Sequence, residues 1–147
     1  MTESLKITHH RFAIQDVLNR YARACDSRDW TLFDDVFTAD VSVDYGGVYK
    51  LTGRDKVVEM ASSMLDGCGP TQHLLGNFDI AVHDDQACCA CYVRAVHAGL
   101  GTEAEHYYEV WAEYRDALQL TGDGWRIFER NMVIHKEVGS RDILRPA

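Results

Sequence analysis

Asp26 is the residue whose position in this sequence most strongly indicates chemistry. It continues a row at spacing four with Leu18 and Ala22, which places it at the C-terminal end of the buried face of a predicted helix. A carboxylate there faces the negative end of the helix dipole and is poorly hydrated, so it needs a partner. The other interpretation is a loop aspartate that caps the next helix, because several cap-type residues precede Trp30.

Two histidines on predicted strands are candidates for acid–base chemistry. His73 shares a strand face with Thr71 and Leu75, which does not settle whether it points inward, so a structural role stays open. His97 projects from a face of small and apolar residues, namely Cys89, Cys91, Val93 and Ala95. That face indicates the cavity side of the sheet, where a histidine is either a site residue or a satisfied core residue.

Arg130 lies on a predicted strand between Phe128 and Met132, two apolar residues of the same face. A buried guanidinium needs an anionic partner or an anionic ligand. The alternative is an outward-facing, solvated arginine, because Arg126 and Lys136 lie in the same alternating register.

Two tyrosines could donate a phenol hydroxyl into a cavity. Tyr45 stands beside Gly46-Gly47 at the end of a predicted strand, and Tyr21 lies on the apolar stripe of the first predicted helix. Each also fits a plain core position.

No metal centre is predicted. Cys89 and Cys91 share one strand face while Cys88 points the other way, and no second CxxC or nearby histidine pair completes a tetrahedral set. The odd total of five cysteines suits a reducing compartment better than a disulfide framework. With no phosphate-cradling glycine loop either, we expect no metal, no nucleotide and no other cofactor.

The elements that must position these residues follow from periodicity. Helices are predicted over about 8–25, with Thr8 as the N-cap, around 30–37 and over about 54–65, and strands over 41–45, 71–82, 86–98, 103–120 and 124–136. Long strands that follow the helices, rather than alternating with them, indicate an α+β fold with an antiparallel sheet and helices on one face. We expect one domain over 1–147, enclosing an apolar cavity for a small-molecule substrate.

Charge and hydropathy exclude other classes of protein. The net charge is −8 and the basic residues are scattered, so no stripe neutralises phosphates and we expect no nucleic-acid partner. The N-terminus lacks the pattern of a secretory signal. No apolar run reaches the roughly 20 residues that span a bilayer. We therefore expect a cytoplasmic protein without a membrane partner.

Four short segments together resemble scytalone dehydratase, a member of the SnoaL-like, nuclear-transport-factor-2-like superfamily. They are CDSRDW at 25–30, VDY at 43–45, TQH at 71–73 and VRAVH at 93–97. The helix aspartate and strand histidine also occur in the similar bile-acid 7α-dehydratases and hexachlorocyclohexane dehydrochlorinase. The resemblance extends over about 14–134 and implies a cone-shaped roll of cystatin-like type, closed by the N-terminal helices.

The same resemblance implies a cofactor-free lyase acting on a small cyclic or polyketide-like molecule. Asp26 would accept the Nδ1 proton of His73, and His73 would be the base that removes a proton next to a carbonyl. Tyr45 and Tyr21 would donate hydrogen bonds to the carbonyl oxygen.

Two further roles are carried over by resemblance alone. His97 would sit near the leaving hydroxyl and could protonate it, and Arg130 would bind the acyl end of the substrate. The alternative from a different class is a non-catalytic small-molecule-binding or assembly domain on the same fold, since one fold hosts many functions.

The strand predicted over 103–120 carries a possible subunit interface. If the face of Tyr108 and Val110 lines the cavity, then Tyr107 and Trp111 lie on the outer surface of the sheet. Large aromatic residues are enriched at interfaces, so we expect a homo-oligomer, with a trimer favoured over a dimer by the relatives named above. Isolated surface aromatics are the alternative.

Overall fold

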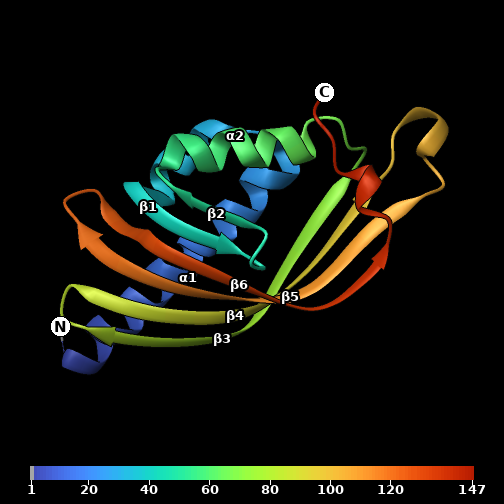
Figure 1. Ribbon diagram of the computed structural model, residues 1–147. Helices are drawn as coiled ribbons and strands as arrows, with labels where there is room; N and C mark the ends of the chain where they lie inside the picture. The colour runs from blue at the N-terminus through green and yellow to red at the C-terminus, as the bar shows by residue number, and fades with distance from the viewer. Residues whose placement is uncertain (1) are drawn as a thin grey trace.

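The computed structural model describes residues 2–147. Its elements run in the order α1 (Glu3–Ser27), η1 (Trp30–Asp35), β1 (Phe37–Tyr45), β2 (Tyr49–Thr52), α2 (Arg54–Leu65), β3 (Thr71–His83), β4 (Gln86–Ala98), η2 (Gly101–Glu103), β5 (Tyr107–Thr121), β6 (Gly124–Gly139) and η3 (Arg141–Ile143). The predicted α+β class is confirmed: one curved, unclosed sheet carries α1 and α2 on the same side (Figure 1).

Helix α1 begins earlier than the sequence predicted. Thr2 is the N-cap and accepts a hydrogen bond from the Leu5 amide, whereas the Thr8 hydroxyl donates to the Ser4 carbonyl from inside the helix. The prediction of Thr8 as N-cap is therefore wrong. The first turns are exposed and carry no buried stripe, so the apolar period could not reveal them. The helix ends at Arg28, whose left-handed φ of 59° lets its amide donate to the Ala24 carbonyl.

The six strands lie in the order β2-β1-β6-β5-β4-β3. Neighbours pair antiparallel except β1 and β6, which pair parallel, a difference from the wholly antiparallel sheet that was predicted. These two strands are far apart in the sequence and are not joined as a hairpin, so local alternation says nothing about their relative direction.

Several strands differ from their predicted extents. β1 begins at Phe37, which was predicted to lie in the second helix, and β6 continues to Gly139 rather than ending near Lys136. β2 was not predicted, because it is short and lies at an exposed sheet edge. β5 begins at Tyr107 rather than near Glu103, because η2 occupies Gly101–Glu103.

Strand β6 contains two bulges that change which residues face inward. Adjacent β5 residues Ala117 and Leu118 pair with Glu129 and Ile127, which leaves Phe128 as an extra residue. The same happens at His135, since Trp111 pairs with Lys136 and Ala112 with Ile134. Each extra residue reverses the inward–outward phase of the strand beyond it.

The apolar core lies between the concave face of the sheet and the helices. Its largest wholly buried apolar side chains are Phe33, Phe37, Ile14, Leu18, Leu118 and Ile127. In the part of the chain described, none of the helices has the length and hydropathy needed to cross a membrane.

Candidate active site

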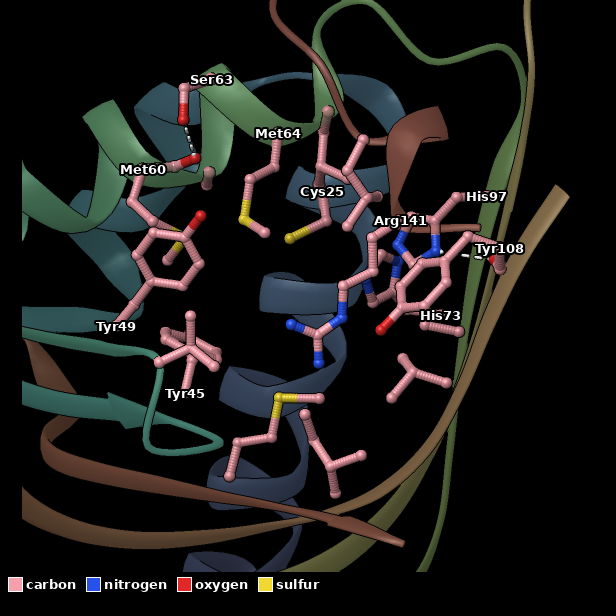
Figure 2. Close-up of a pocket in the computed structure, with 18 of the residues that line it drawn as sticks. Cys25, Tyr45, Tyr49, Met60, Ser63, Met64, His73, His97, Tyr108 and Arg141 are labelled. Atoms are coloured by element: carbon pink, nitrogen blue, oxygen red, sulfur yellow. Dashed lines mark hydrogen bonds between the residues drawn. The ribbon is translucent and has the colours of Figure 1, made fainter. Parts of the chain in front are cut away.

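A cavity of about 270 Å³ opens between the sheet, the C-terminal half of α1 and α2. Its walls combine apolar side chains with a few polar groups, as in most small-molecule sites. The lining residues that matter for chemistry are Tyr21, Cys25, Tyr45, His73, His97, Tyr108 and Arg141, and Figure 2 shows most of them around the open space.

Asp26 and His73 meet at the edge of this cavity. The Nδ1 atom of His73 lies 2.7 Å from Oδ1 of Asp26, and the His73 backbone amide donates to Oδ2 at 2.9 Å. The Thr71 hydroxyl donates to Oδ1 at 2.9 Å. A carboxylate accepts and does not donate, so Nδ1 of His73 carries the proton and Nε2 is the nitrogen with a free lone pair.

These contacts explain the ionisation state of Asp26. Burial alone would raise the pKa of its carboxyl, but the hydrogen bonds from His73 and Thr71 hold the pKa below its usual value. Asp26 is therefore an anion at neutral pH. The alternative role, capping the next helix, belongs to Asp29, whose carboxylate accepts the Thr31 amide.

Arg28 holds in place the segments that carry the Asp26–His73 pair, a role that the sequence did not predict. Its guanidinium donates to the carbonyls of Cys25, Leu65 and Gly69, which joins the end of α1 to the end of α2 and the approach to β3. It also donates to the Thr71 hydroxyl at 2.8 Å, which leaves the hydroxyl proton for Asp26. Arg28 lies in the CDSRDW segment at 25–30, but neither its residue type nor its position just beyond a helix end indicated this role.

Strand register brings the inward side chains into two adjacent rows. Thr71, His97 and Tyr108 pair across β3, β4 and β5, and the next inward row pairs His73 with Ala95 and Val110. The rings of His73 and His97 consequently lie 5.3 Å apart, edge to face.

His97 lies on the cavity side, as its apolar face indicated, and is 4% exposed. Its Nδ1 lies 3.1 Å from the Tyr108 carbonyl, which can only accept, so Nδ1 carries the proton. Burial, with the nearby His73, lowers the pKa of His97 to about 4. The ring is therefore neutral at pH 7, and Nε2 offers an acceptor rather than an acidic proton.

Tyr21 and Tyr45 both line the cavity, and their hydroxyl oxygens lie 3.1 Å apart. One donates to the other, so the pair keeps one proton to donate to a ligand. Burial raises the pKa of both phenols, so both are protonated at neutral pH.

Arg130 does not line this cavity. It is fully buried, and its Nε and Nη2 donate to the two carboxylate oxygens of Asp116 at 2.8 and 2.7 Å. Its guanidinium stacks on the rings of Tyr21 and Tyr114, 4.2 and 4.0 Å from their centroids. The anionic partner expected for a buried arginine is thus a protein carboxylate. The stacked guanidinium also holds the Tyr21 ring in place.

Tyr108 and Arg141 are lining residues that the sequence did not single out as site residues. The Tyr108 hydroxyl donates to Glu137 at 2.7 Å, and Nε of Arg141 donates to the same oxygen, Oε1, at 2.5 Å. Within residues 2–147, no group of three or more histidine, cysteine or acidic side chains is arranged to hold a metal ion.

Comparison with known proteins places the chain in a family. The pattern that defines the SnoaL-like domain matches residues 7–131. The chain belongs to the SnoaL-like domain family. It is 34% identical over 123 residues to an uncharacterized protein of Mycobacterium tuberculosis, a match that covers 82% of each chain.

Solved structures show the same fold at lower identity. A candidate scytalone dehydratase from Novosphingobium aromaticivorans superimposes with a TM-score of 0.79 at 20% identity, covering 95% of this chain and 92% of that one. A hexachlorocyclohexane dehydrochlorinase from Novosphingobium barchaimii gives a TM-score of 0.81 at 14% identity, covering 94% of each chain.

Proposed function

We propose that this SnoaL-like protein is a cofactor-independent lyase, a dehydratase or a related eliminase or isomerase, with Asp26 and His73 as its base. The observation that carries the proposal is the 2.7 Å contact between Nδ1 of His73 and Oδ1 of Asp26 at the wall of a cavity. Two structures of the same fold bear the names of elimination enzymes, a candidate scytalone dehydratase and a hexachlorocyclohexane dehydrochlorinase, which supports this class of reaction.

The reaction begins with removal of a proton from a carbon next to a carbonyl. Nε2 of His73 takes this proton, and the C–H electron pair moves toward the carbonyl oxygen as an enolate. Asp26 remains ionised and stabilises the imidazolium that forms, as the carboxylate of a catalytic triad does.

The hydroxyls of Tyr21 and Tyr45 serve the developing oxyanion. Their shared hydrogen bond leaves one phenol proton to donate into the cavity. Arg130 stacks on the Tyr21 ring as a fixed positive charge, which favours extra negative charge near the hydroxyl.

The enolate then expels the leaving hydroxyl. The C–O bond breaks, the electron pair forms the C=C bond, and the hydroxyl takes the proton from His73 to leave as water. His97 accepts a hydrogen bond from the substrate hydroxyl through Nε2 and orients it. We do not assign His97 the role of acid, because its pKa of about 4 leaves the ring neutral. One base therefore removes and returns the proton, which requires both groups to lie on one face of the substrate.

The size and walls of the cavity support a small cyclic substrate. A volume of about 270 Å³ with aromatic and methionine walls fits one small cyclic molecule better than a polymer or a peptide.

The test is a panel of cyclic β-hydroxyketones, including a β-hydroxytetralone whose dehydration yields a fluorescent naphthol. Asp26→Asn should leave the fold intact but remove the carboxylate that keeps the proton on Nδ1 of His73, so that the wrong tautomer forms. His73→Ala should remove the base. Each should lower turnover by about 100-fold or more, the scale of general-base losses. A ketone without a leaving group should exchange its α-proton for deuterium in deuterated water, which NMR can follow. This exchange tests proton removal by His73 separately from elimination.

The matched control is His83→Ala, an exposed histidine at the far end of the same strand. It should keep wild-type turnover. A folded His73→Ala protein with near-normal turnover would contradict the mechanism. Tight ligand binding by the wild type without turnover or exchange would indicate the non-catalytic binding domain instead.

A further inference from the structure

Arg141 puts a permanent positive charge into a cavity whose other described lining residues are apolar or polar and uncharged, apart from the histidines. Its side chain is 48% exposed, which places it at the mouth rather than in the core. Figure 2 shows its guanidinium reaching into the open space, near the Tyr108 hydroxyl and across from Tyr45.

The guanidinium is held along one edge only. Its Nε donates to Oε1 of Glu137, the same oxygen that accepts the Tyr108 hydroxyl. Neither Nη group donates to a carboxylate or backbone carbonyl of residues 2–147. The end of the fork formed by the two Nη groups is thus available to a ligand.

The backbone that carries Arg141 is pinned in place. Gly139 has a φ of 82°, and a Cβ there would lie 1.9 Å from the Tyr107 carbonyl oxygen, so only glycine allows this close approach. Beyond it, the Ser140 hydroxyl caps η3 by accepting the Asp142 amide, and Arg145 exchanges backbone hydrogen bonds with Met64 and Gly67. The arginine therefore presents its charge from a fixed turn rather than from a free tail.

We infer that the natural ligand of this cavity carries a carboxylate, which Arg141 binds end-on through its two Nη groups. The planar fork of a guanidinium matches the two oxygens of a carboxylate, and such charge-assisted pairs are the stronger hydrogen bonds in proteins. Glu137 holds the arginine by Nε and leaves that end free. This inference rests on the proposed function for the site and narrows its substrates to small cyclic carboxylic acids.

The experiment measures binding and needs no turnover. A naphthoate and the naphthamide of the same ring differ only at one group, a charged carboxylate with two acceptor oxygens against a neutral amide of similar shape, so their affinities isolate the carboxylate contact. Titration calorimetry compares both probes on the wild type, on Arg141→Gln and on the control Arg115→Gln. Arg115 is exposed and pairs with Glu113 away from the cavity, so its variant changes the net charge equally.

The wild type and Arg115→Gln should bind the naphthoate at least about tenfold more tightly than the naphthamide, the scale of a hydrogen bond to a charged group. Arg141→Gln should abolish that preference and leave naphthamide affinity unchanged. Chemical-shift changes in the His97 ring on titration should place the probe in the cavity. An equal preference in Arg141→Gln and the wild type, or a wild type that does not favour the naphthoate, overturns the inference.

The same titration separates this inference from the proposed function. His73→Ala should keep the preference for the naphthoate, because the base plays no part in binding the carboxylate. If turnover is absent but the wild type still prefers the naphthoate, the carboxylate site is supported and the lyase is not. If the protein turns over substrate but does not prefer the naphthoate, the lyase is supported and the carboxylate site is excluded.

Discussion

Separating Asp116 from Arg130 should destabilise the fold more than any change at the surface. Both side chains are 0% exposed, and two hydrogen bonds of 2.8 and 2.7 Å join them. Nη1 of Arg130 is already buried without a partner among residues 2–147. Asp116→Leu would therefore leave a fully buried guanidinium with no carboxylate, because no other acidic side chain in the described part of the chain bonds to it.

The expected cost follows from that burial. Removing one partner of a buried pair costs about 3–5 kcal/mol, because the remaining charge is desolvated and uncompensated. For a chain of this length each kcal/mol lowers Tm by about 2–4 °C, so Tm should fall by about 6–20 °C. Asp116→Leu combined with Arg130→Met removes both charges at similar volume and should cost clearly less than the sum of the two single variants.

Urea unfolding followed by circular dichroism supplies the four free energies of unfolding for this double-mutant cycle. The control pair is Arg115 and Glu113, where Arg115→Gln should cost under about 1 kcal/mol because its side chain is largely exposed. The assignment of a buried ion pair would be refuted if the losses of stability of the two single variants simply add in the double variant. It would also be refuted if Asp116→Leu costs no more stability than the control.

The cycle also tests whether Arg130 binds a ligand. Since Arg130 lies outside the cavity lining, the folded double variant should still bind a cavity ligand. Loss of binding in a folded double variant would instead favour the substrate-binding role that the resemblance implied.

Two further predictions concern His97 and the outer face of the sheet. Because burial lowers the pKa of His97 to about 4 from 6.5, the unfolded chain binds a proton between these values that the folded chain does not. The free energy of unfolding should thus fall as the pH drops through this window, by at most about 3 kcal/mol. Urea titrations at several pH values should show that His97→Gln loses this pH dependence. An equal dependence of the free energy of unfolding on pH in the variant and the wild type would contradict the prediction. Tyr107 and Trp111 are 45% and 41% exposed on the outer face. Light scattering after size exclusion should give a trimer or a dimer, and Trp111→Lys should shift the mass toward one chain; a monomeric wild type at micromolar concentration would exclude the interface.

Much of the framework could be predicted because its patterns are long and local. The period of α1 and of α2 and the two long hairpins each involve a dozen or more residues, enough for one face to stand out. The cysteines of β4 show the same: Cys89 and Cys91 are buried and Cys88 is exposed, as alternation predicted.

The side of His73 could not be predicted because β3 changes phase. Asn77 has a φ of 53°, and the pairing with β4 is interrupted between Gly76 and Asp79. His73 faces inward before this irregularity, whereas Ile80 faces inward after it. A single alternation extended over the whole strand averages the two phases and shows no preferred face.

Bulges also separate Arg130 from the basic residues that shared its apparent face. The extra residues Phe128 and His135 put Arg126 and Lys136 out of phase with Arg130, so those two can meet solvent or surface partners while Arg130 is wholly buried. Nothing in the residue types around a regular strand indicates such a shift, since a bulge depends on the partner strand as well.

The same two bulges govern how positive charge is distributed in the interior. Between them, β6 points Arg130 into the core, where Asp116 takes Nε and Nη2 and the guanidinium lies outside the lining of the cavity. Beyond the second bulge the phase reverses, Glu137 lies opposite Val110 on the inward side, and it reaches Arg141 by one nitrogen. Arg130 thus stabilises the core and packs on the Tyr21 ring, whereas the two Nη groups of Arg141 stay available to a ligand in the cavity. If His135 were deleted, Lys136 would follow Ile134 directly and Glu137 would still lie opposite Val110 on the inward side, where it can hold Arg141. Such a variant, if it folds, should therefore keep both the buried pair and the preference for a carboxylate.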